Sequence, residues 1–98
     1  MLEFNINQLK LDSANRFHLP SKNQLVDKEV VVGRLQDSIL IFEVEEFKVF
    51  IEQIDGFPAT APLIVRRARR NFYSRCFQEK VDQKGRLTIN RKLMKGGI

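Results

Sequence analysis

The sequence predicts a β-rich α+β protein with two short amphipathic helices. Three observations support this fold class: short β-branched runs, two stretches with helical apolar spacing, and a motif that occurs twice. The chain has 98 residues, of which 43% are hydrophobic and 30% are charged. This composition supports a folded core, and the length fits one compact domain or two small interlocked modules.

A β-hairpin is expected in the first half of the chain. Val30–Val32 and Ile39–Phe42 are short apolar runs, and Gly33–Ser38 between them is typical of a turn. From residue 45 to residue 54, apolar residues that include Phe47 and Phe50 recur at steps of three and four. An amphipathic helix should therefore follow the hairpin.

The periodic patterns break over residues 55–62, where two prolines and a glycine occur. We place the boundary between two modules there, which gives segments 1–56 and 57–98. A second helix should begin near Pro62, because the fixed φ and missing N–H of proline suit the first helical turn. A strand is expected over Cys76–Val81, and Cys76 itself is expected to be a small core residue.

An internal repeat is the most informative feature of the sequence. Lys10–Leu19 aligns with Lys80–Ile89 without a gap, so that each residue of the first segment matches the residue 70 positions later. Lysine, aspartate and arginine occupy the same positions in both segments, and the apolar positions of the first segment are also apolar in the second. One Asp-x-x-x-Arg motif is weak evidence, but two copies with matching apolar flanks are far less expected by chance.

Each copy of the motif predicts a tight turn. Asp12 and Asp82 can accept N–H bonds from the residues that follow them. Asn15 and Gly85 are residue types that tolerate the positive φ such a turn needs. Both aspartates are therefore interpreted as structural.

The strands that follow the two turns alternate between apolar and polar residues. The buried face is expected to carry Phe17, Leu19, Leu87 and Ile89. The other side of the unit then holds the candidate nucleic-acid contacts, which are Arg16, His18, Lys84, Arg86 and Thr88. Each arginine either pairs only with its own aspartate, or hydrogen-bonds phosphate or base edges through its planar guanidinium group while the aspartate fixes the orientation of that group.

The charge is distributed unevenly along the chain. Residues 1–60 carry six Lys or Arg and ten Asp or Glu, whereas residues 61–98 carry eleven and two. A surface that faces a polyanion shows such asymmetry, and so does a solvated basic helix with a basic tail. Four arginines lie in the second helix, where they contact phosphate or pair with acids of the first helix or of a neighbouring subunit: Arg66, Arg67, Arg69 and Arg70.

The two motifs, the arginine-rich segment Val65–Arg70 and the run Asp82–Ile89 together resemble the MraZ family of bacterial transcriptional regulators. This family belongs to the wider AbrB-like swapped-hairpin group, and the resemblance extends from Leu11 to about Lys92. It implies tandem swapped-hairpin modules, ring-like assembly of identical chains, and binding to double-stranded DNA at promoter repeats of a division and cell-wall gene cluster. It also implies that Arg16 and Arg86 contact DNA, supported by Asp12 and Asp82, in a cytoplasmic, nucleoid-associated protein.

The second unit departs from the family pattern more than the first. Asn15 stands where glycine is usual and Asn90 where proline is usual, and the sequence ends 16 residues after Asp82 without a counterpart of the hairpin. We therefore expect an uncovered strand edge and exposed apolar faces on Leu87 and Ile89, which association into an oligomer would cover.

Other classes of function are disfavoured by the sequence. One histidine, one cysteine and scattered acids form no nucleophile elbow, phosphate loop, metal-ligand cluster or carboxylate pair. We therefore expect no enzyme, cofactor, metal site or small-molecule substrate, and the lack of a long apolar run or signal peptide predicts no membrane association. The alternative function is an oligomeric scaffold, or a small basic RNA-associated protein without specific DNA readout.

Overall fold

The computed structural model describes residues 1–20, 25–55 and 63–94. The protein has a small, strand-rich α+β fold with two antiparallel sheets, which confirms the predicted fold class. In chain order the elements are β1 (Leu2–Asn5), the 3-10 helix η1 (Ile6–Gln8), β2 (Arg16–His18), β3 (Glu29–Leu35), β4 (Ser38–Glu43), α2 (Val44–Asp55), α3 (Leu63–Tyr73), β5 (Cys76–Lys80), β6 (Arg86–Thr88) and α4 (Arg91–Met94).

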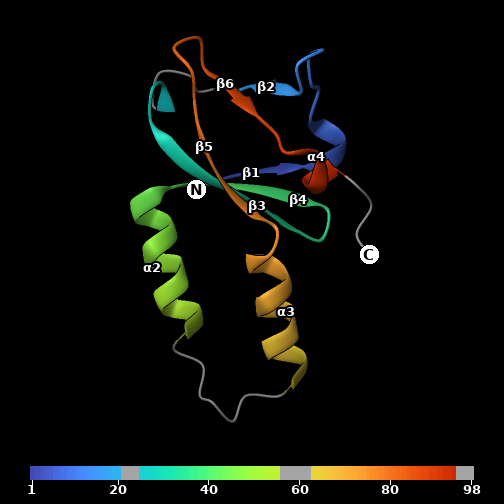
Figure 1. Ribbon diagram of the computed structural model, residues 1–98, viewed down its shortest axis with the longest axis vertical. Coiled ribbons are helices and arrows are strands. Elements are labelled where there is room, and N and C mark those ends of the chain that lie inside the picture. Colours follow the sequence, from blue (N-terminus) through green and yellow to red (C-terminus); the bar gives the residue numbers. More distant parts are fainter. Residues whose placement is uncertain (21–24, 56–62, 95–98) are drawn as a thin grey trace.

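The larger sheet has the strand order β1–β4–β3–β5 (Figure 1). Its centre is the predicted hairpin, which is confirmed as β3 and β4. The predicted turn over Gly33–Ser38 is wrong, because Leu35 pairs with Ser38 and only Gln36 and Asp37 form the turn. Gly33 belongs to β3, since β4 and β5 bond to the two edges of that strand along most of its length.

Strand β1 was not predicted, although Leu2-Glu3-Phe4-Asn5 alternates between apolar and polar residues as an edge strand does. It pairs with β4, and β5 pairs with β3, so the hairpin is flanked by one strand from each half of the chain. The strand predicted over Cys76–Val81 is confirmed as β5.

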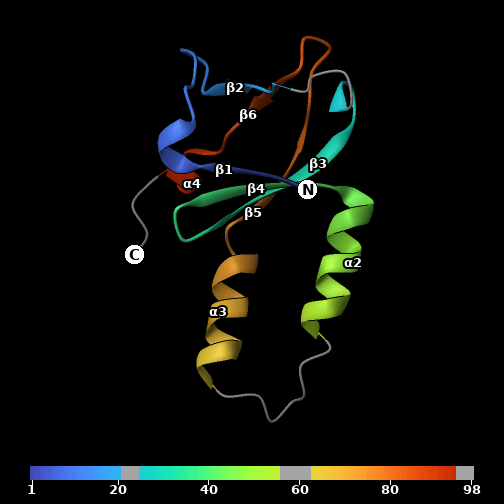
Figure 2. The same ribbon diagram turned by 180° about the vertical axis from the view of Figure 1, so that it is seen from behind.

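The smaller sheet joins the two motif copies directly. Strands β2 and β6 pair antiparallel, with Arg16 opposite Thr88, Phe17 opposite Leu87, and His18 opposite Arg86. We call this pair of strands the ribbon. It lies across one side of the larger sheet in both views (Figures 1 and 2).

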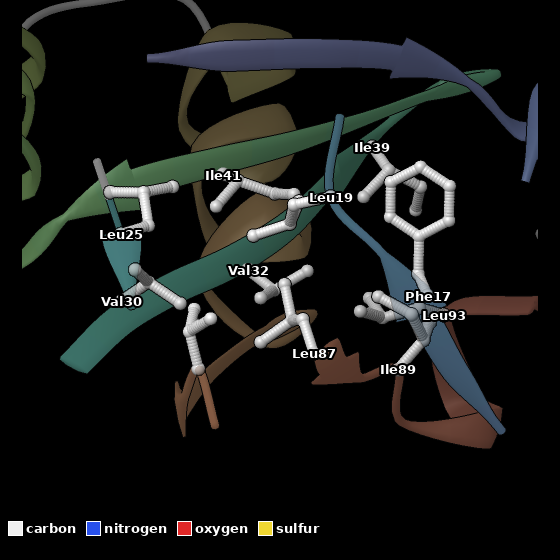
Figure 3. Packing of buried hydrophobic residues seen from close by; sticks show 11 residues of the cluster. Phe17, Leu19, Leu25, Val30, Val32, Ile39, Ile41, Leu87, Ile89 and Leu93 are labelled. Carbon is white, nitrogen blue, oxygen red and sulfur yellow. The ribbon is translucent and has the colours of Figure 1, made fainter. Parts of the chain in front are cut away.

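The main core fills the space between the ribbon and the larger sheet. Figure 3 shows Phe17 and Leu19 from the first unit packed among Leu87, Ile89 and Leu93 from the second. The expectation that Leu87 and Ile89 are uncovered is wrong, because their exposed fractions are 0% and 1%. They are covered within their own chain by the pairing of β6 with β2 and by the first unit's hairpin. Both halves of the chain therefore contribute to one core.

Both predicted helices are confirmed, and they lie on the other side of the larger sheet. A second cluster joins Leu40 and Phe42 of β4 to Phe47 and Phe50 of α2 and Phe72 of α3. From this cluster the two helices extend away from the ribbon (Figures 1 and 2). The predicted break and Pro62 fall largely outside the described residues. Among the described residues, no helix is long and apolar enough to cross a membrane.

Candidate nucleic-acid interface

The two motif turns have the same hydrogen-bond pattern. In the first, Oδ1 of Asp12 accepts from the backbone N of Ala14 at 2.9 Å and of Arg16 at 3.0 Å. In the second, Oδ1 of Asp82 accepts from the N of Lys84 at 2.9 Å and of Arg86 at 2.8 Å. This confirms the structural role predicted for both aspartates.

The fourth residue of each turn has the backbone conformation that the sequence predicted. Asn15 has φ 59° and Gly85 has φ 76°. Their backbone N–H groups donate to the carbonyl oxygens of Asp12 and Asp82 at 3.0 and 3.1 Å. Asparagine and glycine are the residues that reach this left-handed region at least cost, so each turn closes without strain.

Each aspartate also binds the arginine four residues later. Nε of Arg16 donates to Oδ2 of Asp12 at 3.1 Å, and Nε of Arg86 donates to Oδ2 of Asp82 at 2.6 Å. Backbone N–H donation from the arginine is the largest cause that lowers the pKa of each aspartate below its usual 3.8. Both carboxylates are therefore ionised at neutral pH and hold their arginines by Nε. Within the part of the chain that the structure describes, this leaves the Nη groups of both arginines for an external ligand.

The ribbon places the predicted contact residues on its outer side. Phe17 and Leu87 face the core, as the alternation predicted, and the polar neighbours of each occupy the opposite face. His18 and Thr88 are exposed, and the side chains of Arg16 and Arg86 keep 33% and 23% of their surface exposed. Lys84 is exposed in the turn before β6. The structure thus brings together all five candidate contacts: Arg16, His18, Lys84, Arg86 and Thr88.

A local two-fold relation links the two motif copies. Phe17 and Leu87, which are equivalent in the repeat, pair with each other at its centre. On one side of them the N–H of Leu19 donates to the carbonyl of Gly85 at 3.0 Å. On the other side the N–H of Ile89 donates to the carbonyl of Asn15 at 2.9 Å, which is the equivalent bond. One chain therefore presents both arginines on one surface with near two-fold backbone symmetry.

The arginines of the second helix lie elsewhere. Arg67 and Arg70 are exposed and Arg69 is half-buried, while the side chain of Arg66 lies outside the described residues. Helix α3 extends from the opposite side of the larger sheet (Figures 1 and 2), so these arginines do not adjoin the ribbon. Their predicted role as phosphate or interface contacts stays a prediction, separate from the ribbon.

Arg34 is a structurally important residue that sequence reasoning missed. Its side chain is 7% exposed and donates from Nε to the carbonyl of Gln36 and from Nη1 to the carbonyl of Leu93, both at 2.7 Å. It thereby binds the hairpin turn to α4, which follows β6. Arg34 lies in the predicted turn next to Gly33, and no local pattern distinguishes such a residue from an exposed turn arginine.

Cys76 lies half-buried beside the second cluster. Its Sγ donates to the carbonyl of Phe72 at 3.2 Å, and burial raises the pKa of the thiol to about 11. It therefore stays protonated at neutral pH. Within residues 1–20, 25–55 and 63–94, no group of three or more His, Cys, Asp or Glu side chains is placed to hold a metal ion.

Comparison of the chain with protein-family models and with curated proteins found no match. The geometry of the ribbon and the sequence of its two motifs therefore carry the functional argument.

Proposed function

We propose that this protein is a sequence-specific, double-stranded DNA-binding transcriptional regulator of the MraZ type, acting without cofactor or catalysis. The observation that carries this proposal is the ribbon. Two arginines, each held by an aspartate, share one exposed surface formed by two antiparallel strands.

The dimensions of the ribbon match those of B-form DNA. The major groove is about 12 Å wide and admits a two-stranded β-ribbon. Arg16 and Arg86 are diagonal neighbours across the two strands. Diagonal positions on one face of an antiparallel pair lie about 7–8 Å apart. Because successive base pairs rise by about 3.4 Å, this spacing corresponds to roughly two base-pair steps.

The aspartates prepare both arginines for recognition. An arginine that contacts guanine or phosphate in a bidentate manner donates two hydrogen bonds from its planar guanidinium group, so the orientation of that plane must be fixed. In both motifs the bond from Nε to the carboxylate fixes one edge of that plane before any ligand is bound. Less side-chain entropy is then lost on binding.

The interleaving of the two halves supports tandem swapped-hairpin modules as the finer description of the fold. Strand β5 of the second unit completes the sheet around the first unit's hairpin, while β6 pairs with β2. We extend the proposal to a ring-like homo-oligomer that binds promoter repeats of a division and cell-wall gene cluster, in the cytoplasm and associated with the nucleoid.

Duplex binding at several salt concentrations tests this function. The purified chain is titrated against a duplex from its own promoter region and against a scrambled duplex of equal composition. We expect tighter binding to the promoter duplex, and a loss of about 1–3 kcal/mol of specific binding free energy for Arg16→Ala. Lys48→Ala serves as the matched control, because it also removes one positive charge and Lys48 is exposed in α2, which extends away from the ribbon (Figure 1).

Equal affinity for the two duplexes would contradict sequence-specific regulation. A single-stranded RNA of matched length is included for that case. Tighter binding to RNA than to either duplex would favour the small basic RNA-associated protein, and binding to none of the three would favour a scaffold.

A further inference from the structure

The two motif aspartates differ in the side chains that share their carboxylates. Nε2 of His18 lies 3.6 Å from Oδ2 of Asp12, the same oxygen that accepts from Nε of Arg16 at 3.1 Å. In the second motif Oδ2 of Asp82 accepts from Nε of Arg86 at 2.6 Å, and Thr88 stands at the position equivalent to His18. Arg16 therefore shares its aspartate with a basic side chain that the second motif replaces by a hydroxyl.

Protonation of His18 changes the nature of its contact with Asp12. At 3.6 Å the neutral imidazole makes no hydrogen bond to the carboxylate, because such a bond needs about 3.2 Å or less. An imidazolium at this distance forms an ion pair with the oxygen that holds Arg16.

The other charged groups around the imidazole are cationic. Among the described residues of the ribbon, Arg16 lies on the same face of β2 and Arg86 lies directly opposite His18 in β6, with Lys84 in the turn before it. A protonated His18 is therefore attracted by Asp12 and repelled by both arginines, so its new partner is the carboxylate and its nearest competitor is Arg16.

His18 is the single histidine of the sequence, and imidazole is the side chain that ordinarily changes charge between about pH 5 and 8. Backbone N–H donation from the arginines holds the pKa of both motif aspartates below 3.8, so they stay ionised in this range. The Cys76 thiol, with a pKa of about 11, stays neutral. Burial raises the pKa of Glu79, but this residue belongs to β5 of the larger sheet rather than to the ribbon.

We infer, resting on the proposed function, that His18 is a pH-dependent positioning residue for Arg16. When His18 is neutral, Asp12 holds Arg16 alone and fixes the guanidinium plane for base edges. When His18 is protonated, the carboxylate is shared and the imidazolium repels the guanidinium, so Arg16 is held less firmly while the ribbon gains one positive charge. Acidification thus shifts binding from base recognition toward phosphate attraction, and phosphate contacts carry no sequence information.

Duplex binding at about pH 5.5, 6.5 and 7.5 tests this inference with the full chain. The promoter duplex and the scrambled duplex are compared at each pH. The ratio of their affinities should fall about two- to fivefold from the highest to the lowest pH, the range that one exposed ion pair contributes. Affinity for the scrambled duplex should rise, with a slope of log affinity against log salt that is steeper by up to about 0.9.

Two substitutions fix the charge at position 18. His18→Thr gives the first motif the residue of the second, and it should keep the affinity ratio constant over the whole pH range. His18→Lys is charged throughout, and it should show the low ratio of the acidified parent even at the highest pH. Both keep the strand, because the side chain of His18 is 63% exposed. Thr88→Ala is the matched control, since it changes the equivalent exposed position and should leave the pH dependence intact.

A measurement without DNA separates positioning from added charge. Nuclear magnetic resonance follows the exchange of the Nε–H protons of Arg16 and Arg86 with water. Arg86, whose carboxylate is not shared with an imidazole, serves as the internal reference for the intrinsic effect of pH on exchange. On acidification the Arg16 proton should exchange faster relative to that of Arg86 in the parent, and this relative change should be absent in His18→Thr.

The outcomes separate this inference from the function on which it rests. A constant affinity ratio in the parent, or the same pH dependence in His18→Thr, would overturn the inference and leave DNA binding intact. An unchanged relative exchange of Arg16 would assign any pH dependence to added charge alone and would overturn the positioning role. Equal affinity for the two duplexes at every pH would overturn the proposed function, and the exchange measurement would still decide whether His18 loosens Arg16.

Discussion

Phe17 and Leu87 face each other at the centre of the ribbon, and each is the counterpart of the other in the repeat. The local two-fold axis therefore passes between them. Both side chains are buried in the core that the two halves of the chain share, where the ring of Phe4 also meets that of Phe17 edge-on at a centroid distance of 5.0 Å. This pair joins the two motifs into one surface, because it fixes both strands to the same core.

Truncating Leu87 should destabilise the whole protein. Leu87 is fully buried, so we expect Leu87→Ala to cost about 2–5 kcal/mol of unfolding free energy through lost packing and a residual cavity. Chemical denaturation measures this change. Leu35→Ala removes a leucine that is 51% exposed and should fall within about 0.5 kcal/mol of the parent. A small effect at Leu87 would mean that the second unit is not part of the common core.

The motif aspartates should make stability depend on acid pH. Because the pKa of Asp82 is lowered below 3.8 in the folded protein, its contribution to stability is complete above the unfolded value and is lost as pH falls through the folded value. Asp82→Asn should lower the melting temperature at pH 7, and its melting temperature should fall less than that of the parent as the pH drops below about 4. Melting curves over that range measure this, with Glu52→Gln, an exposed residue of α2, as control. Parallel curves for parent and variant would contradict the role of Asp82.

The exposed arginines of α3 should act separately from the ribbon. Arg67 and Arg70 are exposed residues of α3, which extends away from the ribbon (Figure 1), so we expect the double variant Arg67→Ala, Arg70→Ala to keep the salt dependence of DNA binding. We expect it instead to change the size of the assembly, which sedimentation velocity measures. A fall in the slope of log affinity against log salt by about 0.9 per residue would show that α3 contacts phosphates.

Arg34 should stabilise the protein through α4. Replacing its buried guanidinium by Arg34→Met leaves the carbonyl oxygens of Gln36 and Leu93 without their donor. Hydrogen bonds that involve a charged group are worth about 1.5–3 kcal/mol each, so a loss in this range or above is expected in a denaturation experiment. Arg67→Met, at an exposed position, is the control. Equal stability of the two variants would show that the contacts of Arg34 contribute little.

Local patterns predicted much of this fold and site. The hairpin, both long helices and β5 follow from periodicity, and the motif turns follow from the chemistry of Asp, Asn and Gly. The pairing of β2 with β6 joins residues 70 positions apart, and alternation within either strand does not specify its partner. The burial of Leu87 and the contact from Arg34 to Leu93 depend on that long-range pairing, which is why the sequence predicted exposure at Leu87 and gave no role to Arg34.

Gly33 shows how closely the hairpin approaches the second unit. A Cβ atom at this position would lie 2.9 Å from Sγ of Cys76 and 3.1 Å from the ring of Phe72. Since Gly33 pairs with Cys76 between β3 and β5, neither backbone can move away without breaking the sheet. We expect Gly33→Ala to cost about 1–3 kcal/mol of stability through overpacking.

A double-mutant cycle with Cys76→Ala tests the cause of this loss. Removing Sγ relieves the shorter of the two contacts and leaves the one with Phe72, so Gly33→Ala should destabilise the Cys76→Ala background less than it destabilises the parent. Denaturation of the four proteins gives the coupling energy between the two sites. Strict additivity would show that the alanine methyl is accommodated without meeting the sulfur, and that the close approach of β3 to β5 does not depend on glycine.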